Sequence, residues 1–217
     1  MTSFVDDQYY LVNKPLNWTS FDVVNKLRSA FKLKKVGHAG TLDPLATGLL
    51  ILCTGKMTKQ IDSFQSLEKE YEGKFIIGST SPSYDLETLP TKPVSIENVT
   101  EEHIYNTAKS FLGIIKQIPP PYSSIKLKGK RAYELARKGE QFELKSREVE
   151  IKKFEIVKIA KPEIQFRVVC TKGTYIRSLA HDFGQKLNTG ALLSELCRTR
   201  IGEYRLENAK TVEEILK

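Results

Sequence analysis

One carboxylate stands out because of the residues around it. Asp43 lies in the run G-H-A-G-T-L-D-P-L-A-T-G-L-L, from Gly37 to Leu50, directly before the apolar residues 49–52. Pro44 disfavours helical backbone at Asp43 and stiffens its position. The glycines of the run allow backbone angles that other residues resist, and they let a ligand come close. An acid on a rigid loop beside a buried strand is typical of a functional site, where it could serve as a nucleophile or a base.

Two further residues could take part in chemistry. Tyr71 lies in K-E-Y-E-G-K-F-I-I-G, residues 69–78, whose partial alternation predicts a strand. Its ring could pack across strands, or it could stack on a base and place its hydroxyl for proton transfer. Arg177 is expected in the first turn of a helix over 174–187, where the helix dipole disfavours a cation. Arg177 is therefore either a solvated surface residue or the partner of a carboxylate elsewhere in the chain.

The elements that must position these residues alternate irregularly between strands and helices. Strands are predicted over residues 8–13, 49–53, 69–78, 147–159, 164–171 and 199–206. Helices are predicted over 20–31, 56–64, 97–112, 132–138 and 174–187, with a capping box at Thr211–Glu214 opening a last short helix. In the helix over 20–31, Ser20 is the expected cap, and the expected apolar face is Phe21, Val24, Leu27 and Phe31. This pattern predicts an α+β fold with a largely antiparallel or mixed sheet.

Composition limits the classes of function. The 217 residues suffice for one large domain or two small ones, and the net charge of +8 favours a polyanionic partner. The N-terminus lacks the apolar core of a signal peptide, and no stretch approaches the ~20 apolar residues of a membrane span. The three scattered cysteines and three histidines predict a reducing cytoplasm and no metal site.

The run from Gly37 to Leu50 resembles the active-site motif of the TruB family of tRNA pseudouridine synthases. Other segments resemble the family's motifs in the family's order, from about Asn13 to Gly202. The resemblance implies the pseudouridine synthase fold and a single catalytic domain over 1–217. Many longer members carry an additional C-terminal RNA-binding domain of the PUA type, and the residues after Gly202 are too few for it.

The same resemblance assigns the catalytic residues. Asp43 takes the place of the family's catalytic aspartate, and Tyr71 that of its active-site tyrosine. The segment C-T-K-G-T-Y-I-R ends at Arg177 and resembles the motif whose arginine pairs with the catalytic aspartate. A bidentate guanidinium would hold Asp43 ionised and fixed in direction. His38 is the residue expected to fill the space that a flipped nucleotide leaves.

Weaker matches add residues near the substrate. Lys14, in N-K-P, is expected to support the tyrosine strand and the floor of the site. Asp85 matches a substrate-side aspartate, although Pro82 stands where the family often has another acid. Leu193 is a plausible wall of the pocket, and Cys197 stands where an arginine is usual.

A basic segment, Y-S-S-I-K-L-K-G-K-R, resembles the family's RNA-contacting segment. Its lysines could instead form a solvated edge strand. The side chains expected to neutralise RNA phosphates are Lys126, Lys128, Lys130, Arg131, Arg198 and Arg200.

The reaction implied by the resemblance detaches uracil from its ribose and rejoins it through C5, so we expect no cofactor. The target is expected to be the T-loop uridine at tRNA position 55, flipped into the site from the T arm, and the enzyme a cytoplasmic monomer. Two other classes stay open: a non-catalytic RNA-binding or RNA-folding protein, and a hydrolase that uses Asp43 with His38. The hydrolase would need a second acid or a metal, and no second carboxylate lies nearby in the motif.

Overall fold

The computed structural model describes residues 5–127 and 129–217 and divides into two compact units. Unit 1 contains Met1–Glu72 and Glu195–Lys217, and unit 2 contains Gly73–Ser194. Strands β4 (Lys69–Ile77) and β10 (Ala191–Ile201) contribute residues to both units. That residues 1–217 act as a single catalytic domain stays a prediction.

Unit 1 is organised around strand β3 (Ala46–Thr54), all of whose residues except Thr47 are buried. β3 pairs antiparallel with β1 (Tyr9–Lys14) on one side and parallel with β10 on the other. β2 (Val36–His38) also pairs antiparallel with β3, and two short strands complete the unit, β11 (Tyr204–Arg205) on β10 and β12 (Lys210–Thr211) on β1. A strand buried on both faces is expected to be continuously apolar, as residues 49–52 are.

Helix α1 (Ser20–Ala30) packs on this sheet through Val23, Val24 and Leu27, which share a core with residues of β1 and β3. Its N-cap is Thr19, whose side chain accepts from the backbone of Asp22 in a capping box, so the prediction of Ser20 as the cap was one residue late. The predicted apolar face was also partly wrong, because Phe21 is 61% exposed. The other helical segments of unit 1 are Gly55–Gln60, α2 (Ile61–Ser66), Leu206–Asn208 and α6 (Val212–Leu216).

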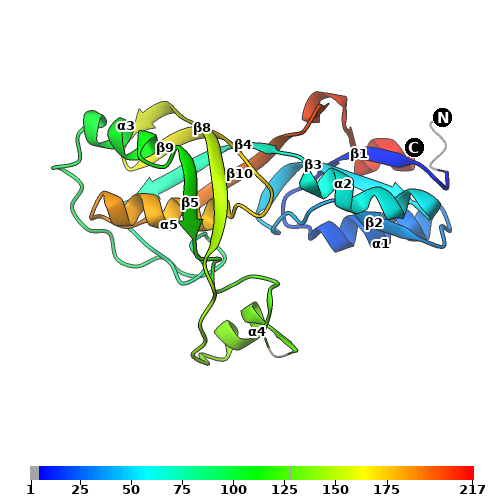
Figure 1. Ribbon diagram of the computed structural model, residues 1–217, viewed down its shortest axis with the longest axis horizontal. Coiled ribbons are helices and arrows are strands. Elements are labelled where there is room, and N and C mark those ends of the chain that lie inside the picture. Colours follow the sequence, from blue (N-terminus) through cyan, green and yellow to red (C-terminus); the bar gives the residue numbers. More distant parts are fainter. Residues whose placement is uncertain (1–4, 128) are drawn as a thin grey trace. The chain divides into compact units, whose positions relative to one another are not determined.

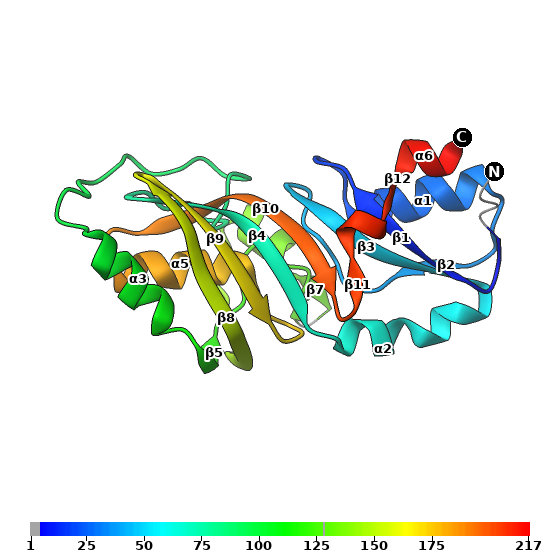
Figure 2. The ribbon, with the colours of Figure 1, turned by 90° about the horizontal axis from the view of Figure 1, so that it is seen from above.

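Unit 2 contains a meander of antiparallel strands. β8 (Arg147–Ala160) pairs with β9 (Glu163–Cys170) on one side and with β5 (Gly113–Gln117) on the other, and β9 lies next to β4 (Figure 2). Phe75, Phe154, Phe166 and Phe183 form the aromatic centre of its core, with Phe75 and Phe166 stacked at 4.1 Å. Phe183 comes from α5 (Ile176–Lys186), so the helix that carries Arg177 is anchored in this core.

Unit 2 also contains a helix packed on this sheet and a projecting segment. α3 (Glu101–Lys109) packs against β8 and α5, and it is shorter than the predicted helix over 97–112. The segment between β5 and β8 projects away from the sheet of its unit and carries α4 (Ala132–Arg137) and the short strands β6 (Lys126–Leu127) and β7 (Lys130–Arg131) (Figure 1). Among the described residues, no helix has the length and apolar character to cross a membrane.

The fold class is therefore α+β with a mixed sheet that is largely antiparallel, as predicted. Most element positions were also correct, including β8, β9 and α5. The main errors concern β10, which begins at Ala191 rather than at Thr199, and β5, which was not predicted.

Candidate active site

The loop that carries Asp43 is fixed at several points of its backbone. It joins β2 to β3, and its last turn closes through the hydrogen bond from Ala46 N to Asp43 O at 3.0 Å. The buried hydroxyl of Ser20 accepts a hydrogen bond from Leu42 N at 2.9 Å, and Asn17 N donates to Pro44 O at 2.8 Å. The residues on both sides of Asp43 are thus held by the start of α1 and the turn before it, while Asp43 itself is half-buried.

Lys14 is a buried cation that binds backbone carbonyls of this loop and of the turn before α1. Its ammonium group donates to the carbonyls of Trp18 at 2.5 Å, Pro15 at 2.9 Å and Pro44 at 3.4 Å. The side chain is fully buried, so Lys14 supports the loop and does not reach RNA directly. Burial lowers the pKa of Lys14 to about 8, against the opposing effect of the nearby Asp43 carboxylate.

Arg198 is a second buried cation at this loop. Its Nε donates to Leu49 O at 2.8 Å and its guanidinium NH₂ to Gly40 O at 3.1 Å, so one side chain ties the loop to strand β3. The prediction that Arg198 neutralises RNA phosphates was wrong, because the side chain is only 1% exposed. Arg200, two residues on, is paired with Glu68 at 2.8 Å and with Glu70 at 3.7 Å, so its charge is already compensated.

The absence of a side chain at Gly48 leaves room for the buried side chains of Lys14 and Arg198 on either side of β3. Lys14 on β1 and Arg198 on β10 are both in register with Gly48 on β3. Side chains of residues in register lie on the same face of a sheet, and Gly48 has none to separate them. A Cβ at Gly48 would lie 2.4 Å from Arg198 O, and its φ of +101° also favours glycine.

Tyr71 and His38 also belong to unit 1. Tyr71 is 8% exposed in β4, where Lys69 and Glu70 are buried as well. His38 ends β2, half-buried, and burial followed by the charge of Arg198 lowers its pKa. The imidazole of His38 is therefore neutral at pH 7, and its buried Nδ1 has no hydrogen-bond partner among the described residues. A neutral ring is suited to packing against a base.

Unit 2 contributes a buried ion pair. Arg177 Nε lies 3.5 Å from Asp85 Oδ2, and both side chains are less than a tenth exposed. The guanidinium also donates to Ser83 O at 3.2 Å and to Tyr122 O at 3.0 Å. Arg177 is in the first turn of α5, as predicted, and it has a carboxylate partner there. Asp43 and Arg177 belong to different units, and their pairing stays a prediction.

Leu193 is placed beside the same ion pair. It forms a parallel bridge with Asp85, its N–H donates to Tyr84 O at 2.9 Å, and its side chain is buried. In unit 1 the leucine next to the Asp43 loop is Leu196, half-buried and in register with Ala46. The sequence did not indicate that Leu196 lies there, because the register of β10 on β3 was not visible in it.

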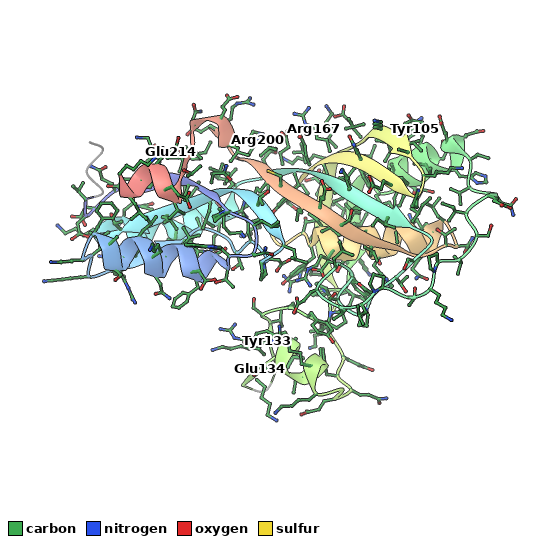
Figure 3. All side chains as sticks on the ribbon, turned by 180° about the vertical axis from the view of Figure 1, so that it is seen from behind. Tyr105, Tyr133, Glu134, Arg167, Arg200 and Glu214 are labelled. Carbon is green, nitrogen blue, oxygen red and sulfur yellow. The ribbon has the colours of Figure 1, made fainter. Side chains whose placement is uncertain are left out.

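The lysines of the basic segment lie in the projecting part of unit 2. Lys126 and Lys130 are exposed at the ends of the β6–β7 hairpin, and Lys128 lies outside the described residues. Arg131 is held by Ser124 O at 2.6 Å. Tyr133 and Glu134 of α4 lie in the same projecting segment (Figure 3). Among the described residues, no group of three or more His, Cys, Asp or Glu side chains could hold a metal ion.

Comparison with known proteins gives a consistent set of relatives. A profile described as the N-terminal domain of TruB family pseudouridylate synthase matches residues 28–176. The chain is 54% identical over 213 residues to a protein named tRNA pseudouridine synthase B from Flavobacterium johnsoniae, covering 95% of this chain and 93% of that protein. A protein of the same name from Parabacteroides distasonis is 52% identical over 218 residues, with 98% and 93% covered.

Solved structures agree with the fold. A chain in the structure of an H/ACA RNP bound to a substrate RNA containing 2′-deoxyuridine is 28% identical and has a TM-score of 0.72. A chain in a Cbf5–Nop10–Gar1 complex is 29% identical and has a TM-score of 0.73. Both comparisons cover 96% of this chain, which spans about half the length of those chains, 52% and 53%.

Proposed function

Because the chain belongs to the TruB family of pseudouridylate synthases, we propose that it converts the T-loop uridine at position 55 of tRNA to pseudouridine, with Asp43 as the catalytic carboxylate. It is an isomerase. The bond between N1 of uracil and C1′ of the ribose breaks, the base turns, and C5 bonds to C1′ in place of N1. The proton on C5 is lost and N1 gains one, so no electrons are exchanged with a cofactor.

The observation that carries the proposal is the way unit 1 presents Asp43. The carboxylate lies on a loop whose neighbouring carbonyls are held by the buried cations of Lys14 and Arg198. A carboxylate can act as a nucleophile or base on the sugar only when it is correctly aimed at the reacting atom. Backbone bonds on both sides of Asp43 supply that aim.

The target base must leave its stack to reach Asp43, so the reaction requires base flipping. In the proposal, Tyr71 stacks on the flipped uracil and its hydroxyl assists the late proton transfer at C5. His38 fills the space that the nucleotide vacates. Its neutral, half-buried ring suits this role, because no charge must be desolvated when the ring meets a base.

Unit 2 would supply the remaining groups. Arg177 is proposed to pair with Asp43, and Asp85 orients its guanidinium through the observed ion pair. Leu193 packs behind Asp85 as part of the pocket wall. Lys126, Lys128 and Lys130 are proposed to contact the T-arm backbone. We further propose that the protein works in the cytoplasm as a monomer without cofactor or metal.

The test is product formation on tRNA labelled with tritium at C5 of uridine, followed by mass mapping of the modified nucleotide. The parent protein should release tritium, whereas Asp43→Asn should bind tRNA equally well and release none. Asp62→Asn, at an exposed aspartate on α2, is the matched control and should keep full activity.

The same assay separates the other classes of function. Binding without tritium release by the parent would favour an RNA-folding protein, and strand or base cleavage would favour a hydrolase. Turnover by Asp43→Asn within tenfold of the parent would contradict the catalytic role of Asp43.

A further inference from the structure

A pair of stacked rings lies next to the Asp85–Arg177 ion pair. The ring of Tyr84 stacks on that of His181 with centroids 4.0 Å apart and planes 13° apart. Arg177 and His181 are four residues apart on α5, so they share one face of the helix. The consecutive residues Tyr84 and Asp85 therefore contact the same face of α5. The Tyr84 ring stacks on His181, and the Asp85 carboxylate pairs with Arg177.

The backbone at Tyr84 is held in a conformation that tyrosine rarely adopts. Its φ is +65°, in the left-handed region that favours glycine, asparagine and aspartate. Such strain persists only where the surroundings hold it, and it is common at functional sites. Here Tyr84 O accepts from Leu193 N at 2.9 Å, and Tyr84 N donates to Ser81 O at 3.1 Å. The backbone is thus tied on one side to β10 and on the other to its own turn.

The strained turn determines where the Asp85 carboxylate points. The backbone carbonyl of Asp85 accepts a hydrogen bond from the buried hydroxyl of Ser81 at 2.5 Å. The side-chain Oδ1 of Asp85 accepts one from Glu87 N at 2.9 Å. That leaves Oδ2 directed at Arg177, at 3.5 Å. A change of backbone conformation at Tyr84 would rotate the whole peptide that leads into Asp85.

His181 contributes to this arrangement by packing. Its buried Nδ1 has no hydrogen-bond partner among the described residues. Burial lowers the pKa of His181, so the ring is neutral at neutral pH and stacks without bringing a second cation beside Arg177. Burial and the charge of Asp182 raise the pKa of Tyr84, the residue on which His181 stacks, and burial raises the pKa of Asp182 to about 6.

We propose that the stack of Tyr84 on His181 is a positioning pair that aims Asp85 at Arg177 and thereby sets the orientation of the Arg177 guanidinium for the reaction. This inference rests on the proposed function, in which Arg177 acts at the reacting centre. Neither ring is assigned to RNA or to proton transfer. A small displacement of a catalytic group is enough to slow a reaction strongly, even when the affinity for the substrate is unchanged.

Substitutions at Tyr84 separate the ring from the backbone. Tyr84→Phe keeps the stack, and we expect the parental rate. Tyr84→Asn tolerates the left-handed backbone but lacks the ring, and we expect a rate about tenfold or more lower at saturating tRNA, with tRNA affinity within twofold of the parent. Leu86→Ala, at an exposed residue of the same loop, is the matched control and should behave as the parent.

A double-mutant cycle tests whether the ring acts through Asp85. In the Asp85→Asn background, adding Tyr84→Asn should cause no further loss, because the ion pair to be aimed is already gone. A purely structural role predicts the same loss in both backgrounds and would overturn the proposal, as would a parental rate for Tyr84→Asn or a defect in Tyr84→Phe.

His181 gives a second route should Tyr84→Asn fold poorly. His181→Phe retains a ring that can stack and should keep the rate, whereas His181→Leu should lose it. Equal rates for the two would overturn the proposal. If the parent protein makes no pseudouridine, the proposed function fails. If the parent is active and these variants match it, only the inference about the stack fails.

Discussion

Lys14 and Arg198 flank the same residue, Gly48, from opposite neighbouring strands, and both are buried. Two like charges so close would normally be unfavourable, and Arg198 indeed contributes to lowering the pKa of Lys14. Both cations donate to backbone carbonyls of the loop around Asp43. The sheet thus concentrates positive charge beside the Asp43 carboxylate. Five testable predictions concern this site and its RNA substrate.

The first concerns Gly48. An alanine there would place its Cβ against the backbone of Arg198 and would also have to adopt a φ of +101°. We expect Gly48→Ala to lower the free energy of unfolding by about 1 kcal/mol for the backbone and roughly 1–3 kcal/mol more for the clash. Gly113→Ala is the control, because Gly113 has a φ of +91° and open space around its Cβ position. Denaturant melts should show a larger loss for Gly48→Ala. Equal losses would mean that the close approach to Arg198 is unimportant.

The second concerns the pH dependence of stability through Lys14. The folded protein releases the Lys14 proton at a pKa of about 8, whereas the unfolded chain keeps it up to the ordinary value of 10.5. Between these values the unfolded state binds more protons, so the contribution of Lys14 to stability rises with pH. The cost of burying the charge is fully present below pH 8 and is relieved by pH 10.5.

The measurement is the free energy of unfolding of the parent relative to Lys14→Met across that window. The difference should move in favour of the parent as the pH rises from about 8 to 10.5. Lys59→Met, at an exposed lysine, should show no such trend. A difference that is flat with pH would mean that folding does not lower the pKa of Lys14.

The third concerns the Tyr71 hydroxyl. Tyr71→Phe keeps a ring that can stack, worth roughly 1–3 kcal/mol per base, so tRNA affinity should be nearly unchanged. Loss of the hydroxyl should lower the single-turnover rate by about 10²–10⁴ if it moves a proton. Tyr105→Phe, on the half-exposed face of α3 (Figure 3), is the control and should retain the rate. A parental rate for Tyr71→Phe would reduce Tyr71 to a packing residue.

The residues at the site differ in how far the sequence could predict them. Asp43, its glycines and Pro44 are adjacent in the chain, so local backbone rules are enough to predict a rigid loop before a buried strand. The burial of Arg198 depends instead on β10 pairing parallel to β3 in one particular register, 150 residues along the chain from Gly48. No local pattern determines such a register, and a basic residue in R-T-R is as suited to solvent as to a core.

Smaller errors have similar causes. Thr19 and Ser20 are both good caps, and only the Asp22 side chain, which bonds back to Thr19, decides between them. Phe21 fits a helical period but points away from the sheet, because the buried face of α1 is that of Val23, Val24 and Leu27. The place of Arg177 at a helix start left two interpretations open, a solvated surface residue or the partner of a carboxylate, and the buried ion pair with Asp85 supports the second, while pairing with Asp43 stays a prediction.

The fourth prediction concerns the lysines of the projecting segment. Lys126 and Lys130 are exposed in the structure. For contacts to single-stranded RNA, the slope of log affinity against log salt should be about −0.7 per neutralised phosphate. Replacing Lys126, Lys128 and Lys130 with alanine should flatten this slope, whereas replacing the exposed Lys56 and Lys59 should leave it unchanged. An unchanged slope in the triple variant would mean that these lysines are only a solvated edge.

The fifth prediction is that a T-arm stem-loop alone is a sufficient substrate. In the proposed complex, Asp43 reacts with one flipped nucleotide and His38 fills the space that this nucleotide leaves. The lysines of the projecting segment contact a short stretch of RNA backbone. One hairpin offers all three contacts. Flipping a nucleotide from a loop also costs less than flipping it from a stable duplex, because fewer stacking and pairing interactions are lost.

The comparison is between full-length tRNA, the isolated T-arm hairpin and a linear RNA with the sequence of the T loop, each assayed by tritium release and mass mapping. The hairpin should be modified at position 55 at a rate within about tenfold of tRNA, since each tenfold corresponds to only about 1.4 kcal/mol. The linear RNA should react more slowly, because it must pay the entropy of forming the loop. Conversion of a uridine elsewhere in tRNA, or failure to modify the hairpin, would contradict the assignment of the T loop as the site of reaction.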